Sequence, residues 1–344
     1  MKFRWKVTMG CRAMHKMLLP ICILLSFAVR AAGVREIAIP ADPDGPEIAA
    51  HLWTPCAVPP GPIEVASGAA SLTIQAAKDC APPAEALPLI LVSHGMFGDM
   101  FSHHDTAAFL ADAGLAVVTL NHPLDSIYSS RETVDNLSSF TVRPADIKRA
   151  IAFLLSDLQD SVDIDSQRIG FFGFSRGGYT GLVLAGAVPD FRAPPFSCPE
   201  EFFMCRQMRE NNIPEHEPGD EPRIKAFVIA DPVSFFPDKA SLQGATDPIQ
   251  LWSSDHGGMG VRPEDVATIR DNLPRTPEFH RPANSGHLSF QFPCSEKLAK
   301  VMSLECTDPP GFDRTAFHRT FNAKVLQFFR ANLGRHSPET RATK

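Results

Sequence analysis

The stretch that most constrains the fold of this chain is residues 168–180, which read RIGFFGFSRGGYT. An apolar run typical of a strand leads into a Gly-Phe-Ser-Arg-Gly turn centred on Ser175, and residues 181–187 can form a helix. Strand, sharp turn and helix is the context in which a G-x-S-x-G string presents a serine nucleophile. A turn this tight strains the backbone of the serine and brings its neighbours close together. The positions two before and two after the serine must therefore lack a side chain. A glycine-rich turn that only packs a helix against a sheet is the alternative interpretation.

Strand and helix patterns alternate on both sides of this stretch. Further strands are expected at 87–93, 116–120, 224–230, 249–253 and 278–282, and helices at 106–113, 144–158 and 316–333. The alternation predicts an α/β fold with a mostly parallel, doubly wound sheet flanked by helices on both faces. Before the first central strand, residues 35–39 and 47–54 are expected to form a hairpin. Residues 56–87, rich in Pro, Gly and Ala, are expected to form an irregular surface excursion.

The N-terminus has the features of an export signal. Five basic residues between positions 2 and 16 precede an apolar run at 17–29, and small residues at 31–33 supply a cleavage site. We therefore expect a signal peptide at 1–32, one domain at 33–334, and a polar C-terminal tail at 335–344, in a periplasmic or secreted protein. An uncleaved anchor is the weaker alternative, because the run is short for a bilayer span.

Removal of this segment changes the charge of the chain. Residues 1–31 hold six of the 33 Lys and Arg and no acid, which leaves 27 basic against 39 acidic residues and a net charge of −12. Such a chain has no electrostatic reason to bind nucleic acid or an anionic membrane. No stable membrane anchor is expected after cleavage, and nothing in the sequence implies an obligate protein partner or a particular oligomeric state.

The cysteines agree with export. Six remain after the signal, and they fall as three local pairs, each flanking a loop: Cys56 with Cys80, Cys198 with Cys205, and Cys294 with Cys306. This spacing suggests three disulfides in an oxidising compartment, although six cysteines allow fifteen connectivities. A cysteine-rich metal site is the alternative, but no C-x-x-C spacing supports it.

One segment breaks the alternation of strands and helices. Residues 189–222 carry many prolines and charges together with the Cys198 and Cys205 pair. An insertion at this place lies over the carboxyl ends of the strands, where ligands bind in open α/β sheets. We expect a disulfide-closed lid that shapes the substrate pocket, and a solvated loop without a role is the alternative.

A serine on such an elbow needs a base and an orienting acid, and both follow it in the chain. His287, in an Asn-Ser-Gly-His loop after the last expected strand, is the expected base, with His256 a weaker candidate. Asp255 follows the strand at 249–253 and is the expected acid. Asp231 ends the strand at 224–230 and is the alternative acid. The other histidines after the serine are read as surface or core residues: His216, His280, His318 and His336.

The oxyanion of an acyl-transfer reaction needs backbone donors close to the serine. One is expected from Arg176, the next residue, and another from the His-Gly-Met-Phe-Gly loop after the first central strand. In that loop the amide of Met96 is the expected donor and that of Phe97 is the next candidate. His94 is expected to brace the loop rather than to titrate.

No metal or cofactor site is predicted. His103, His104 and Asp105 are adjacent in the chain and have no third ligand at a suitable spacing, so Asp105 is expected to cap a helix instead. Gly170 and Gly173 lack the dinucleotide-binding spacing.

Together these motifs resemble a known family. The strings Ser-His-Gly at 93–95, Arg-Pro-Ala-Asp-Ile at 143–147, Gly-Phe-Ser-Arg-Gly-Gly-Tyr at 173–179 and Gly-His at 286–287 are similar to those of exported α/β hydrolases. The chain resembles dienelactone-hydrolase-like proteins related to platelet-activating-factor acetylhydrolase, over about residues 34–333. The resemblance implies an α/β-hydrolase fold. Dienelactone hydrolases proper use a cysteine nucleophile, and the serine at position 175 favours a carboxylesterase instead.

The sequence therefore predicts a cofactor-free serine hydrolase that cleaves carboxylic esters through a Ser-His-Asp triad and an acyl-enzyme, an ester hydrolase of the EC 3.1.1 type. Its substrate is expected to be a small-molecule or lipid-like ester. One alternative is an acetylhydrolase or phospholipase-type activity on lipid esters. An alternative of another class is a catalytically silent binding protein on the same fold.

Overall fold

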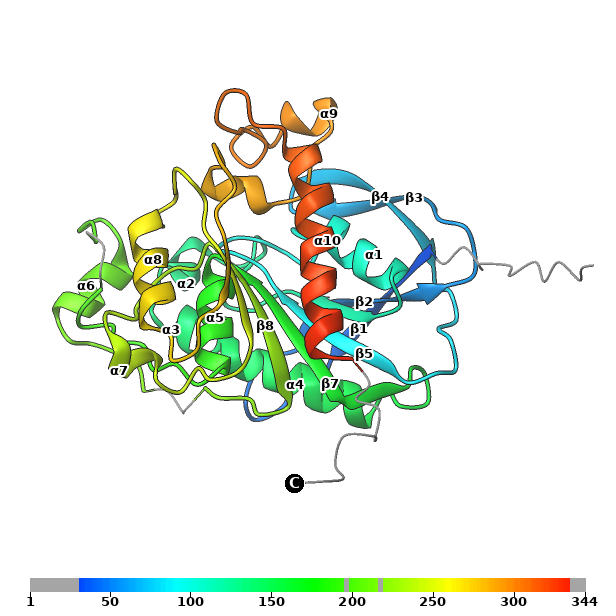
Figure 1. Cartoon of the computed structure of the whole chain (residues 1–344), viewed down its shortest axis with the longest axis horizontal. Coiled ribbons are helices and arrows are strands. Elements are labelled where there is room, and N and C mark those ends of the chain that lie inside the picture. The colour runs from blue at the N-terminus through cyan, green and yellow to red at the C-terminus, as the bar shows by residue number, and fades with distance from the viewer. Residues whose placement is uncertain (1–30, 195–197, 216–218, 335–344) are drawn as a thin grey trace, which may run out of the picture.

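A computed structural model describes residues 31–194, 198–215 and 219–334. The expected C-terminal tail and all but the last two residues of the expected signal peptide lie outside these residues. Ten strands form one sheet in the order β10-β9-β8-β7-β5-β6-β2-β1-β4-β3 (Figure 1). The strands are β1 Ala31–Ile39, β2 Ile48–Cys56, β3 Gly61–Ser67, β4 Ala70–Lys78, β5 Leu87–Ser93, β6 Ala116–Leu120, β7 Ile164–Phe174, β8 Ile224–Ala230, β9 Ile249–Trp252 and β10 Glu278–His280.

The described helices fall between and after these strands. They are α1 His104–Asp112, α2 Arg131–Val134, α3 Ser138–Thr141, α4 Arg143–Ser156, α5 Arg176–Leu184, α6 Phe203–Arg209, α7 Lys239–Leu242, α8 Pro263–Asn272, the 3₁₀ turn η1 His287–Phe290, α9 Glu296–Ala299 and α10 Arg314–Asn332. Each strand and helix expected in the alternating part of the chain is present within a few residues. The exception is the helix after Ser175, which begins at once at Arg176 rather than at 181.

The sheet is mixed. Six strands that are neighbours in the sheet, in the order β6, β5, β7, β8, β9 and β10, pair in parallel, as the alternation of strands and helices requires. The hairpin of β1 and β2 then adds to β6 in antiparallel fashion. This hairpin confirms the one expected around residues 42–46. Because β1 begins at Ala31, the expected cleavage region lies in the first residues of that strand.

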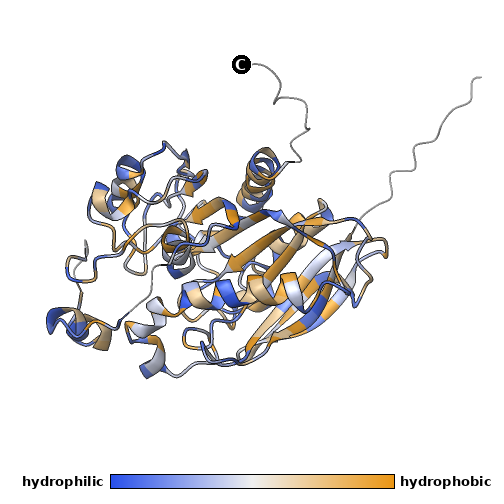
Figure 2. Cartoon of the chain, turned by 90° about the horizontal axis from the view of Figure 1, so that it is seen from below, coloured by the Kyte–Doolittle hydropathy of each residue, from blue (hydrophilic) through white to orange (hydrophobic). Residues whose placement is uncertain are grey.

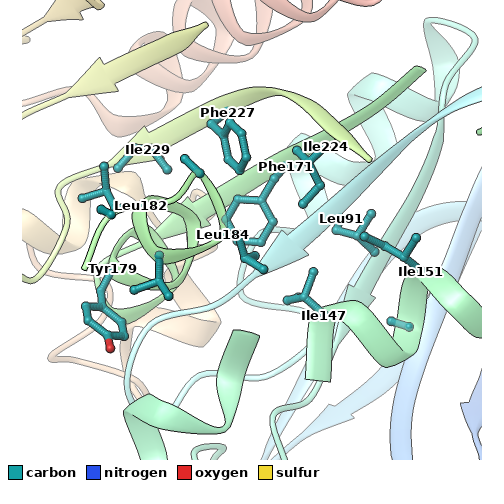
Figure 3. Packing of buried hydrophobic residues seen from close by; sticks show 14 of the residues in the cluster. Leu91, Ile147, Ile151, Phe171, Tyr179, Leu182, Leu184, Ile224, Phe227 and Ile229 are labelled. Carbon is teal, nitrogen blue, oxygen red and sulfur yellow. The ribbon is translucent and has the colours of Figure 1, made fainter. Parts of the chain in front are cut away.

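The two faces of the sheet bury separate hydrophobic clusters. Along β5, Leu89 and Leu91 point to one face, while Ile90 and Val92 point to the other, as the two-residue period of a strand requires. Helices α4 and α5 cover the first face, where Ile147 and Leu182 pack against the strands (Figure 3). Helices α1 and α10 cover the second face, and the central strands are coloured as hydrophobic between the layers (Figure 2).

Residues 56–87 do not form an irregular excursion. Strands β3 and β4 make an antiparallel hairpin, and the end of β4 pairs with β1 at Gly33 and Val34, which extends the sheet. In β4 the apolar Leu72 and Ile74 are buried, and Thr73 between them is exposed. Tertiary pairing with β1 decides the structure here, over the loop-like composition of the segment.

Three disulfides join the local cysteine pairs: Cys56–Cys80, Cys198–Cys205 and Cys294–Cys306. They match the expected connectivity and indicate an extracellular or periplasmic environment, because such bonds persist in oxidising compartments. Within the described residues, no helix has both the length and the apolar character needed to cross a membrane.

The carboxyl ends of the central strands meet at one edge of the sheet. Ser93 at the end of β5 pairs with Gly173 of β7, and Phe174 at the end of β7 pairs with Ala230 of β8. The residues that follow these strands therefore lie next to one another. In open α/β sheets this edge is where ligands bind.

Candidate active site

Ser175 is held on a strained turn between β7 and α5. Its backbone has φ +56° and ψ −114°, which L-residues seldom adopt. The amide of Ser175 donates to the carbonyl of Ala230 at 2.9 Å, and its own carbonyl accepts from Tyr179 and Val233. These bonds to β8, to α5 and to the loop after β8 hold the turn in place.

The two flanking glycines are sterically required. A Cβ atom added to Gly173 would lie 2.1 Å from the carbonyl oxygen of Gly177, and one added to Gly177 would lie 1.9 Å from that of Ser93. Both contacts are with backbone atoms, so no side chain could move aside to relieve them. The glycine spacing in the motif is thus a consequence of how closely β7, α5 and the end of β5 approach.

A chain of hydrogen bonds runs from Ser175 through His287 to Asp231. The Ser175 hydroxyl lies 3.1 Å from Nε2 of His287, and Nδ1 of His287 lies 2.6 Å from Oδ2 of Asp231. All three side chains are buried. A carboxylate accepts from Nδ1–H, and this places the lone pair of the imidazole on Nε2, facing the serine.

Other groups hold the histidine and the acid in this geometry. Asp231 accepts from the amide and the hydroxyl of Ser254, each at 2.7 Å, so both of its oxygens have partners. His287 donates its amide to the carbonyl of Gly257 at 2.9 Å. The ring of Phe174, the residue before Ser175, lies 4.7 Å from the His287 ring, centre to centre. The imidazole is therefore fixed on several sides.

Asp255, the first choice for the acid, does not contact His287. Its carboxylate faces Arg281 at 3.0 Å and accepts from the amide of Asn284 at 2.9 Å. The side chain is 33% exposed, against 0% for Asp231. The Asn284 amide, with help from Arg281, holds the pKa of Asp255 below its ordinary value. Asp255 thus fastens the loop that leads to His287.

The physical reason for this difference is the path of the chain after β9. Ser254 turns inward to Asp231, and the next residue is directed outward to the loop at 281–285. Both acids follow parallel strands, so the strand-end position alone could not distinguish them. His256, the weaker candidate base, is exposed and bonds to Asn284 at 3.0 Å.

The loop after β5 lies directly against Ser175. A Cβ on Gly95 would come within 3.2 Å of the Cβ of Ser175 and of the Phe174 ring. Met96 and Arg176 line the same cavity as Ser175. Arg176 is the first residue of α5, so its amide has no acceptor within the helix and sits at the positive end of the helix dipole.

A buried charge cluster ties this loop to the elbow. Asp125 accepts from Arg143 at 2.7 Å and from Arg176 at 3.1 Å, and all three side chains are almost fully buried. Arg143 also donates to the hydroxyl of Ser93 at 3.0 Å and to the carbonyl of His94. The guanidinium of Arg176 contacts Sδ of Met96 at 3.1 Å. Sequence reasoning missed this cluster, because its members are far apart in the chain.

His94 and a second histidine, His122, hold the loop after β5 in place. Nδ1 of His94 bonds to the carbonyl of Gly95, and Nε2 of His94 accepts from the amide of His122. Burial and the nearby Arg143 lower the pKa of His94 to about 3. His94 is therefore neutral at ordinary pH, as expected for a bracing residue. His122 in turn bonds to Ser93 at 2.9 Å and to Asp146 at 2.8 Å.

Asp105 does not cap a helix. His103 occupies the N-cap position of α1 without a side-chain bond, and Asp105 lies inside the helix. Oδ2 of Asp105 instead accepts from His318 at 2.7 Å and from Asn322 at 3.1 Å, both on α10. The side chain therefore joins α1 to α10. In the described ranges, no three His, Cys, Asp or Glu side chains are grouped so as to hold a metal ion.

A cavity of about 410 Å³ opens over Ser175 and His287. Four phenylalanines contribute to its walls: Phe140, Phe174, Phe202 and Phe235. Part of the 189–222 segment forms one side, through Pro199, Met204 and the Cys198–Cys205 disulfide. Among the described residues that line it, Arg176 is the only Lys, Arg, Asp or Glu, and its guanidinium is engaged by Asp125. The cavity thus suits an uncharged, apolar group.

Comparisons with known proteins relate the chain to solved structures only. No family model matches it, and no curated protein matches it in sequence. The structure of a ferulic acid esterase from Streptomyces cinnamoneus superposes with a TM-score of 0.60 at 16% sequence identity. The match covers 93% of this chain and 95% of that one. At this identity the likeness concerns the fold, and it extends over the sheet and its flanking helices.

Proposed function

We propose that this chain is an exported serine hydrolase of the α/β-hydrolase fold that cleaves carboxylic esters. The observation that carries the proposal is the buried chain of hydrogen bonds from Ser175 through His287 to Asp231 at the base of an apolar cavity. The likeness to an esterase structure supports it. The narrower resemblance to dienelactone-hydrolase-like and acetylhydrolase proteins belongs to the same proposal.

In this mechanism the Ser175 hydroxyl attacks the ester carbonyl while Nε2 of His287 takes its proton. Asp231 keeps Nδ1 protonated and stabilises the imidazolium. The amides of Met96 and Arg176 donate to the oxyanion of the tetrahedral intermediate. His287 then gives its proton to the departing alcohol, and an acyl-enzyme remains on Ser175. Water repeats the sequence and releases the acid.

The walls of the cavity favour an aromatic acyl group. Phenyl rings prefer edge-on and offset contacts with other rings, and four phenylalanines surround the serine. The structural neighbour is by its name an esterase of an aromatic acid. We therefore propose benzoyl-type and cinnamoyl-type esters as the first substrates to test. The segment at 189–222 acts in this proposal as the wall that selects the acyl group.

A second candidate is hydrolysis of lipid-like esters. Phe202, which lines the cavity, and the adjacent Phe203 are 36% and 38% exposed. Such side chains could contact an aggregated substrate. This candidate shares the catalytic residues and differs only in the substrate.

The test is hydrolysis of p-nitrophenyl esters from acetyl to dodecanoyl, with the benzoyl ester in the same series and Ser175→Ala as background. We expect turnover that depends on Ser175, is highest for benzoyl and short acyl groups, and falls beyond about eight carbons, the length that a cavity of this size can enclose. Rates that keep rising to dodecanoyl would favour the lipid-ester candidate. If no turnover depends on Ser175 and a fluorophosphonate does not label Ser175, the chain is instead a catalytically silent binding protein on the same fold.

A further inference from the structure

A second cavity, of about 180 Å³, adjoins the one over Ser175. The two share four lining residues, Met96, Met259, Leu288 and Gln291. Leu288 and Gln291 belong to or directly follow η1, the 3₁₀ turn that begins with His287. The two cavities therefore lie side by side, next to the turn that carries His287.

The inner side of the second cavity is polar. Ser67, Asp99 and Ser102 line it, and all three side chains are buried. Oδ1 of Asp99 accepts from the amide of Phe101 at 2.9 Å, whereas Oδ2 has no hydrogen bond within the described part of the chain. Burial raises the pKa of Asp99, and hydrogen bonds from Ser67, Phe101 and Ser102 offset only part of that rise. A buried carboxylate that is only partly satisfied favours a ligand that brings a further donor.

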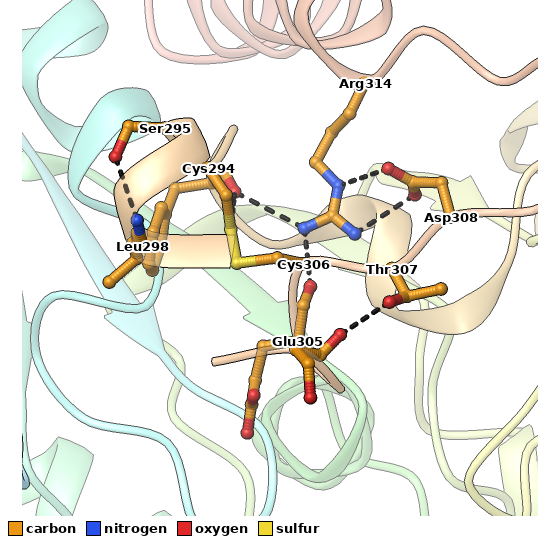
Figure 4. Close-up of a disulfide and its surroundings, with 10 residues drawn as sticks. Cys294, Ser295, Leu298, Glu305, Cys306, Thr307, Asp308 and Arg314 are labelled. Atoms are coloured by element: carbon orange, nitrogen blue, oxygen red, sulfur yellow. Dashed lines mark hydrogen bonds and ion pairs between the residues drawn. A yellow bond between two sulfur atoms is a disulfide. The ribbon is translucent and has the colours of Figure 1, made fainter. Parts of the chain in front are cut away.

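The outer wall of the second cavity is the loop closed by Cys294–Cys306. Leu304 and Glu305 of this loop line the cavity. Figure 4 shows how the loop is held, with Arg314 bonded to both oxygens of Asp308 at 2.9 and 3.1 Å and to the carbonyl of Glu305. Asp308 also accepts from Ser289 of η1 at 2.6 Å, so the wall and the turn that carries His287 are one assembly.

The charge of the lining restricts the ligand further. Asp99 and Glu305 line the second cavity, and its lining residues include no Lys or Arg. An anionic group would be repelled and left without a partner there. The remaining walls are apolar except for Gln291, and Phe97 and Leu304 are partly exposed at the rim. The cavity thus combines apolar walls with hydrogen-bond acceptors and is too small for a long chain.

We propose that the second cavity binds the alcohol part of the ester and selects an uncharged, hydroxyl-bearing alcohol, such as a short polyol. This inference rests on the proposed function of Ser175. His287 protonates the departing alcohol, and Leu288 and Gln291, which follow His287 in the chain, line the second cavity, so the alcohol is assigned to it. A hydroxyl on the second or third carbon of the alcohol donates to Asp99.

The experiment compares three benzoate esters with alcohols of three carbons: propyl, 2,3-dihydroxypropyl and 2-carboxyethyl. We expect kcat/KM for the dihydroxypropyl ester to exceed that for the propyl ester by about tenfold to a hundredfold, the value of a hydrogen bond to a charged group. The carboxyethyl ester is expected to be the slowest. Asp99→Asn should reduce both differences, since the variant has no charge.

A matched pair of substitutions in the disulfide loop provides a second measurement that does not depend on Asp99. Leu304 lines the cavity and is 58% exposed, whereas Val301 is 71% exposed and does not line it. Leu304→Trp is expected to bring the dihydroxypropyl-to-propyl ratio close to one. Val301→Trp is expected to leave the ratio and the rates unchanged.

Equal kcat/KM for the three esters in the unsubstituted protein would overturn the inference. So would a ratio that is the same in the Leu304→Trp and Val301→Trp variants. Failure of the proposed function gives a different result, because no ester, p-nitrophenyl acetate included, would then show turnover that depends on Ser175.

Discussion

Asp231→Asn is expected to lower kcat about 10⁴-fold, the cost of losing the orienting carboxylate in a serine triad. Oδ1 of Asp231 accepts from the amide of Ser254, which can only donate, so the asparagine oxygen takes this position. Its NH₂ group then replaces Oδ2 and faces Nδ1 of His287. The imidazole must then accept on Nδ1 and carry its proton on Nε2. In that tautomer it cannot take the proton of Ser175.

The matched control is Asp255→Asn, the same chemical change at the other strand end. Asp255 forms a partly exposed ion pair with Arg281, and solvent screening makes such a pair weak. Turnover should therefore stay within about fivefold of the unsubstituted enzyme. Steady-state kinetics on one p-nitrophenyl ester measures both. A large loss in Asp255→Asn with near-full turnover in Asp231→Asn would refute the assignment of the acid.

Asp125→Ala is expected to reduce the free energy of unfolding by about 3–5 kcal/mol, the cost of breaking a buried ion pair on one side. The substitution leaves the guanidinium groups of Arg143 and Arg176 buried without their shared carboxylate. The amide of Phe97 also loses its acceptor, at 3.4 Å in the structure. Urea denaturation followed by circular dichroism measures the change.

The control for this variant is Asp271→Ala, which removes an ion pair with Arg270 in which both side chains are exposed. Its free energy of unfolding should change little, because solvent screens an exposed ion pair. A similar small change in Asp125→Ala would mean that the cluster is not required for stability. Because Arg143 and Arg176 hold Ser93, His94 and Met96, we also expect kcat of folded Asp125→Ala to fall more than its KM rises.

Some of this architecture follows from local sequence patterns. The continuous apolar run of β5 predicts a strand buried on both faces of a parallel sheet, and the pattern of residues 144–158 predicts the amphipathic helix α4. Ser175 could be placed on its elbow because the glycines at 173 and 177 are a steric requirement of the turn itself. Short spacing suggested the disulfides, since residues close in the chain are close in space in nearly any fold.

Other features depend on which segments meet. The composition of residues 56–87 resembles a loop, although Ile63 and Val65 alternate with polar residues in the manner of a strand. The pairing of β4 with β1 stabilises these residues as strands, which the weak alternation alone does not do. Asp231 and Asp255 each follow a parallel strand, and the inward turn at Ser254 decides which one reaches His287. The local sequence does not predict that turn.

The sequence by itself therefore determined the strained turn that carries Ser175, the loop that carries His287 and the order of strands and helices, because these are set by local sterics and periodicity. The tertiary structure alone decided which acid bonds to His287, the Arg143–Asp125–Arg176 cluster and the second cavity. In each of these, the interacting groups are separated by tens of residues and approach only when the sheet aligns its strand ends. Their contact energies depend on burial and geometry, which a linear pattern does not specify.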